Sequence, residues 1–190
     1  MSLVAPAAIA LVHYPVYDRN RRTVMSAITN LDLHDIARAA RTFGLSRYYV
    51  VTPSDGQRRL AAQILGHWQS GYGATYNPKR KEALDHVAVR GSLDEVVREM
   101  ESEYGVAPLV VATGASADAT TTYADLRRSL TRSRIPHLLV FGTGWGLTEE
   151  VMAGAAEILP PITGPGAYNH LSVRSAAAII LDRLFGDRPR

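Results

Sequence analysis

Three segments in the second half of the chain combine glycine or proline with few charged side chains. They cover residues 113–116, 142–147 and 160–168. Glycines let the backbone approach a ligand closely and present its amide N–H groups, and prolines hold a loop in one conformation. Trp145 adds a flat apolar surface to the middle segment. Together the three segments predict a small-molecule pocket built largely from backbone.

Each segment also has a simpler interpretation. Gly142, Gly144 and Gly146 form G-x-G-x-G-L, which differs from the G-x-G-x-x-G of dinucleotide-binding loops, and no P-loop Lys-Ser/Thr follows. A tight strand-to-helix turn explains these glycines equally well. A stiff connection with Asn169 as a helix N-cap explains the proline segment. A pocket is favoured because all three segments follow predicted strands.

A cationic stripe is predicted on a helix nearer the amino end. His34, Arg38 and Arg41 have the spacing i, i+4 and i+7, so helical geometry places them on one face. Two guanidinium groups on one face can bind phosphate or orient a nucleobase. The alternative is a solvated polar face on which Asp35 pairs with Arg38.

Residues 71–81 form a predicted surface loop that mixes aromatic and cationic side chains. These side chains are Tyr72, Tyr76, Lys79, Arg80 and Lys81. Proteins that bind single-stranded RNA combine the same residue types. An exposed loop also collects such residues by chance, so both interpretations stay open.

Several chemistries are excluded by composition and motif. The chain has no cysteine, which excludes disulfides, thiolate zinc sites, iron–sulfur clusters and a cysteine nucleophile. No HxH, HExxH or G-x-S-x-G occurs, and a capping role already explains Asp32 in the Asp32-x-His34-Asp35 cluster. We therefore expect no metal site and no serine nucleophile.

Length and composition predict one domain over residues 1–190. Hydrophobic residues make up 46% of the chain, charged residues 21%, and the net charge is +3, as in ordinary globular proteins. The longest apolar stretch, residues 3–12, is ten residues long, whereas a membrane helix needs roughly 20. No basic residue precedes it. We expect a cytoplasmic protein without membrane contact.

The elements that position the three segments alternate along the chain. Apolar runs predict strands at residues 7–13, 48–52, 86–89, 108–112, 137–141 and 157–159. Amphipathic spacing predicts helices at 30–44, 55–70, 93–103, 123–132, 148–153 and 169–185, with Asn30 or Asp32 as the first N-cap. Such alternation predicts an α/β fold, a parallel sheet covered by helices on both faces. Ligands bind such sheets beyond the carboxyl ends of their strands.

The order of these motifs resembles the SPOUT superfamily of α/β-knot RNA methyltransferases. Residues 29–44 resemble its first motif, an Asn followed by a helix with Arg38 six residues before Gly44. Residues 141–147 resemble the second motif and residues 168–177 the third. The chain is most similar to the small stand-alone bacterial group that is sometimes fused to a tRNA guanine methyltransferase.

The resemblance implies a deep C-terminal trefoil knot, a homodimer, and S-adenosylmethionine bound bent within the knot. It implies a catalytic role for Arg38 near the transferred methyl group. The cofactor-binding candidates are Thr113, Gly114, Phe141, Gly142, Thr143, Gly144, Trp145, Gly146, Ile158, Leu159, Ile162, Asn169, His170, Leu171 and Ser172. The RNA-binding candidates are His34, Arg41, Lys79, Arg80, Lys81 and Arg174.

Two positions depart from the family pattern. Many relatives carry a Glu in the second motif where this chain has Gly144, and Ser172 stands where the third-motif Asn is expected. Candidate substitutes are Glu149, Glu150, Asn169, His170 and Arg174. The leading hypothesis is an S-adenosylmethionine-dependent RNA methyltransferase acting on tRNA or rRNA. The alternatives are a knotted RNA-binding or assembly protein without catalysis and a nicotinamide-dependent oxidoreductase.

Overall fold

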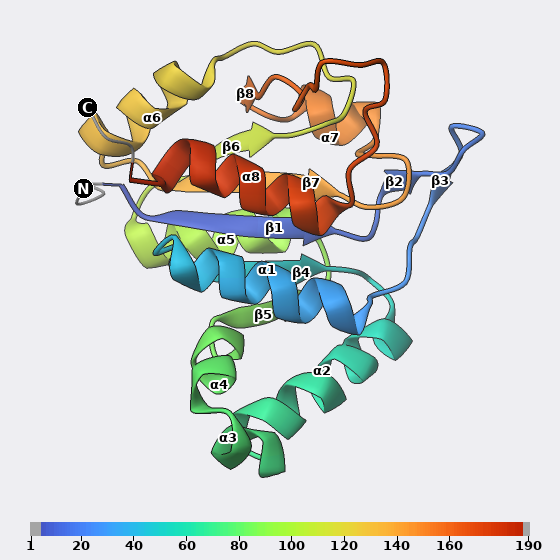
Figure 1. Cartoon of the computed structure of the whole chain (residues 1–190), viewed down its shortest axis with the longest axis vertical. Helices are drawn as coiled ribbons and strands as arrows, with labels where there is room; N and C mark the ends of the chain where they lie inside the picture. The colour runs from blue at the N-terminus through green and yellow to red at the C-terminus, as the bar shows by residue number, and fades with distance from the viewer. Residues whose placement is uncertain (1–4, 188–190) are drawn as a thin grey trace.

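The structure, a computed structural model, describes residues 5–187. Residues 1–4 and 188–190, the ends of the predicted 1–190 domain, lie outside the described part. Its centre is a sheet of six parallel strands in the order β5-β4-β1-β7-β6-β8 (Figure 1). The strands are β1 (Ala7–Val12), β4 (Arg47–Val51), β5 (Val87–Arg90), β6 (Leu109–Ala112), β7 (His137–Gly142) and β8 (Glu157–Ile158). The predicted parallel α/β sheet is confirmed.

The central strands are apolar throughout because both faces of the sheet are covered. Every residue of β1 is buried, and side chains alternate between the two faces as strand geometry requires. Ile9 and Leu11 belong to one core, whereas Ala8, Ala10 and Val12 belong to the other. The sheet therefore carries two hydrophobic cores, one on each face.

Three helices cover the first face. They are α1 (Asn30–Thr42), α6 (Tyr123–Arg132) and α8 (Val173–Phe185). The helix α8 lies beside α1 and in front of β7 (Figure 1), although 130 residues separate their sequences. Buried Leu33 and Ile36 of α1 and Leu181 of α8 enter the same core as Ile9. Long-range packing thus fixes the last helix against the first.

The opposite face is covered by α5 (Leu93–Tyr104) and α7 (Glu149–Ala153). Val96 and Met100 of α5 are fully or almost fully buried against the second core. A short antiparallel hairpin, β2 (Val16–Tyr17) with β3 (Thr23–Val24), also packs there. The sequence analysis did not predict this hairpin, because each strand is only two residues long.

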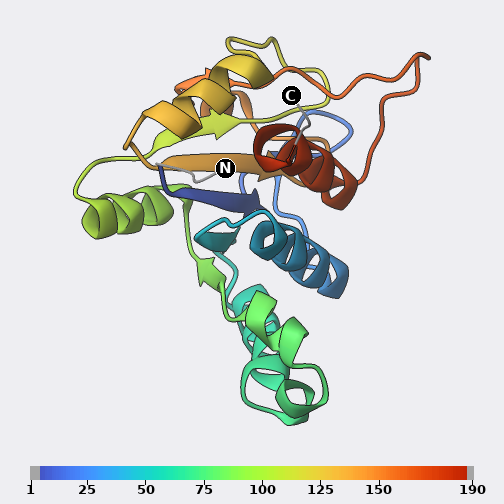
Figure 2. The same ribbon diagram turned by 60° about the vertical axis from the view of Figure 1, so that its left-hand side comes forward.

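Residues 71–81 were predicted as a loop, and this prediction is wrong. The segment forms α3 (Tyr72–Tyr76) and the start of α4 (Pro78–Leu84). Asn77 caps α4 with its side chain, which accepts from the Arg80 backbone N–H, and proline occupies the first turn. With α2 (Asp55–Gln69), these helices project from the sheet as an arm (Figure 2). We call residues 55–84 the arm.

One predicted N-cap and one predicted helix start are also wrong. The side chain of Thr29, not Asn30 or Asp32, caps α1 by accepting from the Asp32 N–H at 3.1 Å. The last helix starts at Val173 rather than at residue 169, because Ser172 caps it by accepting from the Ser175 N–H at 3.2 Å. Residues 169–171 are thereby left in the loop that leads to the cavity described next.

The C-terminal knot stays a prediction. The strand β8 lies outside β6 at the sheet edge, and the chain then returns to pack α8 over the centre of the sheet. In the segment between β6 and α6, Thr120 and Thr121 donate backbone N–H groups to the Ile158 carbonyl of β8. No helix within residues 5–187 is long and apolar enough to cross a membrane.

Candidate functional site: a cavity at the carboxyl ends of the strands

A cavity of about 1050 Å³ opens where the strand order reverses, beyond the carboxyl ends of β6, β7 and β8. Small-ligand pockets span roughly 300–1,000 Å³, so this one has room for a nucleotide-sized group and more. All three predicted segments reach it. The predicted cofactor-binding residues in its wall are Thr113, Gly114, Phe141, Gly142, Thr143, Gly144, Trp145, Gly146, Ile158, Ile162, Asn169, His170, Leu171 and Ser172.

Leu159 is the one predicted cofactor-binding residue outside this wall. It is fully buried and belongs to the core of the first face. Its neighbours Ile158 and Ile162 line the cavity instead. Sequence alone could not separate them, because all three are apolar residues in or near a short edge strand.

The middle segment is held by its backbone. Trp145 donates its N–H to the Tyr17 carbonyl at 2.9 Å, and Tyr17 donates its N–H to the Gly146 carbonyl at 2.9 Å. Gly144 and Gly146 have φ of +59° and +100°, a region that side chains rarely tolerate. A Cβ on Gly142 would stand 2.7 Å from the Leu147 nitrogen. The hairpin that sequence analysis missed is therefore a support of the cavity.

The other two segments are tied to each other. Asn169 donates its side-chain N–H to the Ala115 carbonyl at 2.7 Å, which joins the proline segment to the loop after β6. The ring of His170 lies 6.4 Å from that of Trp145, which is 63% exposed. The three segments thus form one continuous wall, with an aromatic surface open at its mouth.

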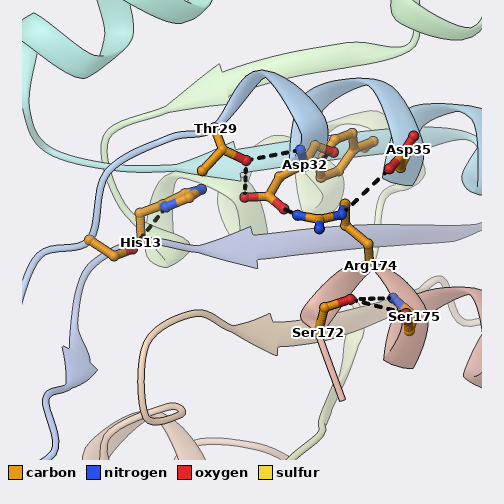
Figure 3. A network of polar contacts seen from close by, with 9 residues as sticks. His13, Thr29, Asp32, Asp35, Ser172, Arg174 and Ser175 are labelled. Carbon is orange, nitrogen blue, oxygen red and sulfur yellow. Dashed lines mark hydrogen bonds and ion pairs between the residues drawn. The ribbon is translucent and has the colours of Figure 1, made fainter. Parts of the chain in front are cut away.

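An ion pair closes another side of the cavity. Arg174, at the start of α8, donates to Asp32 of α1 at 2.8 Å and lies 3.4 Å from the Asp35 carboxylate (Figure 3). The other oxygen of Asp32 accepts from the Thr29 hydroxyl at 2.6 Å. Asp32 is 5% exposed, so its charge needs these partners. Asp35 therefore pairs with Arg174 here rather than with Arg38 as the alternative interpretation proposed.

A buried polar chain supports the cavity from below. His13 is fully buried, and its Nδ1 lies 2.9 Å from the hydroxyl of Ser26. That hydroxyl lies 2.5 Å from the Thr143 hydroxyl, which donates to the Val12 carbonyl at 3.0 Å. Burial lowers the pKa of His13 to about 4, although the Asp32 carboxylate acts in the opposite direction. His13 is therefore neutral at pH 7, and Ser26 and Thr143 carry the chain to the cavity wall.

Arg38 lies outside the cavity wall of its own chain. It is exposed on α1, six residues beyond Asp32, the last residue of this helix in the cavity wall. Asp32, Arg174 and Ser26 line the cavity instead and were not predicted as catalytic or cofactor-binding residues. Arg174 had a signal, since it stood in the third motif. Ser26 had none, because it precedes α1 in an irregular segment.

The remaining predicted RNA-binding residues also lie away from the cavity. Arg41 pairs with Glu82 at 2.7 Å, Lys79 pairs with the same carboxylate at 3.2 Å, and Lys81 pairs with Asp85 at 2.6 Å. All three ion pairs are on α4 or between α4 and α1. The structure thus separates the predicted residues into a cavity group and an arm group.

His34 and Arg80 meet at Trp68, where the arm joins α1. The His34 ring packs edge-on to Trp68 at 5.3 Å, and the Arg80 guanidinium lies 4.4 Å from the centre of the Trp68 ring. Burial, and then the charge of Arg80, lowers the pKa of His34. Within residues 5–187, no group of three or more His, Asp or Glu could hold a metal ion.

The fold and the cavity define an α/β protein with a nucleotide-sized site at the switch point of a parallel sheet. Residues 6–186 match the family of SAM-dependent RNA methyltransferases. The chain belongs to this family, and the resemblance to the SPOUT superfamily is confirmed.

Three relatives show how far the similarity extends. The tRNA (guanine-N(1)-)-methyltransferase of Oleidesulfovibrio alaskensis is 45% identical over 178 residues, or 94% of this chain and 41% of that protein. The protein of the same name from Nitratidesulfovibrio vulgaris is 46% identical over 182 residues, with the same coverage. The chain thus spans about two fifths of these relatives. An uncharacterized protein of Aquifex aeolicus is 43% identical over 178 residues, or 93% of this chain and 87% of that protein.

Solved structures share the fold. A probable methyltransferase from Bordetella pertussis has a TM-score of 0.63 at 18% identity, with 95% of each chain covered. TrmJ from Z. mobilis ZM4 has a TM-score of 0.62 at 18% identity, covering 98% of this chain and 73% of that one. The A. aeolicus TrmH/SpoU tRNA modifying enzyme has a TM-score of 0.56 at 14% identity, covering 94% and 73%.

The cavity fits S-adenosylmethionine, the cofactor of the family. At Gly146 no atom lies within 4 Å of where a Cβ would stand, so the backbone there is open to a ligand. Apolar side chains of Ile158, Ile162 and Leu171 line the cavity beside polar backbone, as a purine requires. Asp118 adds a carboxylate to the wall, which favours a positively charged ligand, whereas the Glu149 carboxylate pairs with Arg21 of the same wall at 2.8 Å.

Proposed function

We propose that this chain transfers a methyl group from S-adenosylmethionine to tRNA. The observation that carries the proposal is the cavity, in which three separate segments with the family motifs form one wall. The names of the two curated relatives, both tRNA (guanine-N(1)-)-methyltransferases, support tRNA as the acceptor. Because the chain spans about two fifths of those proteins, the proposal does not name guanine N1 as the atom that is methylated.

The residues around the cavity would mainly bind and orient. S-adenosylmethionine supplies a methyl group that its sulfonium already activates. Gly142, Gly144 and Gly146 let the backbone contact the cofactor, and Trp145 with His170 offers flat surfaces at the mouth. Alignment of two reactants can supply several kcal/mol of a barrier. A pre-organised cavity is therefore the main contribution that this chain makes.

Arg38 is proposed to act in the cavity of a second copy. It is exposed and does not line the cavity of its own chain, so a role near the methyl group requires another molecule. A homodimer that packs the α1 faces together would bring each guanidinium to its neighbour's site. There it would orient the RNA acceptor or stabilise charge that develops on it.

Two further expectations belong to this proposal. The C-terminal knot would keep the third segment fixed against the first, consistent with the hydrogen bond from Asn169 to Ala115. A tRNA substrate would place the protein in the cytoplasm.

The test is transfer of radiolabelled methyl groups from S-adenosylmethionine to total tRNA. We expect incorporation by the wild type, and at least a hundredfold slower transfer by Arg38→Ala with unchanged cofactor affinity in calorimetry. Arg98→Ala is the matched control, because Arg98 is exposed on α5 at the opposite face of the sheet. Cofactor binding without any methylated tRNA would instead favour a knotted RNA-binding protein. Equal rates for Arg38→Ala and the wild type would remove Arg38 from the mechanism.

A further inference from the structure

The arm carries two large aromatic rings that contact little of the protein. Tyr72 and Tyr76 are 75% and 71% exposed. Their rings stack with 6.0 Å between centres and 24° between planes, because α3 places positions i and i+4 on one side. Isolated exposed tyrosines need no explanation, but a stacked and exposed pair offers a continuous flat surface.

This surface is held rigidly from beneath. Gly73, between the two tyrosines, packs so closely that a Cβ there would stand 2.6 Å from the Trp68 ring and 3.0 Å from His67. Trp68 in turn packs between Arg80 on α4 and His34 on α1. A fixed aromatic surface loses little conformational entropy when it binds a partner.

Basic side chains outnumber acidic ones in and beside the arm. Residues 55–85 contain five basic and three acidic side chains, a net charge of +2 out of +3 for the whole chain. Lys79 is 91% exposed, and its carboxylate partner Glu82 is already shared with Arg41. Exposed ion pairs of this kind contribute little and exchange readily for a stronger anion. The chemistry of the arm therefore suits a polyanion with flat rings.

The helix α1 connects the arm to the cavity. Its N-cap Thr29 and Asp32 in its first turn line the cavity. His34, two residues after Asp32, contacts Trp68, and Arg41 in the last turn pairs with Glu82 of α4. Its 13 residues span roughly 20 Å. A nucleic acid bound at the cavity can cover this distance with a few nucleotides.

We infer that the arm is a second RNA contact, at which unpaired bases stack on Tyr72 and Tyr76 while Lys79 and Arg80 contact the phosphates. The inference rests on the proposed function in that the RNA held here is the RNA methylated at the cavity. Stacking on aromatic rings tolerates any base. The arm would therefore hold a single-stranded loop or end of the substrate without reading its sequence.

The experiment measures binding of a fluorescently labelled oligouridylate of twelve nucleotides by anisotropy. Stacking contributes about 1–3 kcal/mol per base, so we expect Tyr72→Ala/Tyr76→Ala to raise the Kd at least tenfold. Tyr72→Phe/Tyr76→Phe is the matched control, because it retains both rings, and should stay within about twofold of the wild type. Duplex RNA of the same length should bind the three proteins equally. Both rings are exposed, so the variants should keep the wild-type circular dichroism.

Three results would overturn the inference: no binding of oligouridylate by the wild type, equal affinity for the wild type and the alanine variant, or loss of a dimer in the alanine variant. The last result would identify the surface as a contact between copies. The proposed function fails independently, through absent cofactor binding or absent methyl transfer. If the protein bound oligouridylate through the tyrosines but transferred no methyl group, the RNA contact at the arm would stand and the proposed methyltransferase activity would be wrong.

Discussion

The cavity and the arm are built in opposite ways. The cavity wall joins segments near residues 29, 113, 142 and 170, which only the parallel sheet brings together. Its contacts run mostly through backbone, as in the hydrogen bonds between Tyr17 and the glycine segment. The arm is one continuous stretch, residues 55–84, and its contacts run through side chains such as Trp68, Arg80 and Tyr72.

This difference shows which kind of ligand each of the two regions can recognise. A wall of backbone amides suits a cofactor that must be held in one geometry. Exposed rings and cations suit an RNA segment of variable sequence. The two regions are linked through α1 and through the Ile28 N–H, which donates to the Gln57 side chain of α2 at 2.6 Å. Because neither the tyrosines nor the glycine segment belongs to these links, substitutions there should leave the binding partner of the other region unaffected.

The largest expected effect is at Gly142. In Gly142→Val the side chain would start 2.7 Å from the Leu147 nitrogen and 3.0 Å from the Gly146 carbonyl carbon, so the glycine segment must move. We expect S-adenosylmethionine affinity to fall at least a hundredfold in calorimetry. Oligouridylate affinity at the arm should stay unchanged.

Gly164→Ala is the matched control for this substitution. Gly164 lies in the proline segment, its φ is not positive, and no atom lies within 4 Å of where its Cβ would stand. Its cofactor affinity should match that of the wild type. If Gly142→Val bound the cofactor normally, the backbone wall would not be the binding surface.

The loops of the cavity could be predicted from the sequence because glycine and proline indicate where the backbone needs an unusual or a fixed conformation. Glycines and prolines after apolar runs marked the loops, and the parallel sheet placed those loops at one edge. Strand and helix positions were predicted mostly within one or two residues. Contacts between distant side chains, such as Asp32 with Arg174, have no local signal and required the structure.

The arm could not be predicted for a different reason. Gly71, Gly73 and Pro78 are ordinary loop residues, and they favoured a loop over residues 71–81. Pro78 instead occupies the first turn of α4, and Gly73 allows α3 to pack against Trp68. Tertiary packing thus overrode a local preference for a loop. What the sequence supplied for the arm is the set of aromatic and cationic residue types on which the RNA-binding hypothesis is based.

The next largest effect concerns His13 beneath the cavity. Burial lowers its pKa from 6.5 to about 4, so between these values the unfolded chain binds a proton that the folded chain does not. Stability should therefore fall as the pH is lowered through this window, by roughly 3 kcal/mol when complete near pH 4. The lowered pKa values of His34 and His137 act in the same direction. Urea unfolding at a series of pH values measures the slope.

His13→Gln separates the contribution of His13 from those of the other two. It keeps a hydrogen-bonding group for Ser26 and removes the titrating one, so its stability should depend less steeply on pH between 6.5 and 4. Identical slopes for the variant and the wild type would show that His13 is not the group responsible. The His13→Gln variant should bind oligouridylate at the arm with the affinity of the wild type.

A smaller effect is expected at the ion pair beside the cavity. Asp32→Asn leaves Arg174 without its closest carboxylate, at 30% side-chain exposure. We expect a loss of about 2 kcal/mol in the free energy of unfolding, below the roughly 3–5 kcal/mol of a fully buried pair. Asp35→Asn is the control. Its carboxylate is 50% exposed and 3.4 Å from the same Arg174, so a loss above about 1 kcal/mol there would contradict the ranking.

The smallest effect tests the junction between the two regions. Arg80→Ala removes a guanidinium that lies 4.4 Å from the centre of the Trp68 ring, which should cost about 0.5–1 kcal/mol of stability. Burial chiefly lowers the pKa of His34, and the Arg80 charge lowers it further. That pKa should therefore rise in the variant, as NMR titration of the imidazole measures. Lys79→Ala on the same helix should leave the stability and the pKa of His34 near their wild-type values. Unchanged cofactor affinity in both variants would show that the arm does not influence cofactor binding in the cavity.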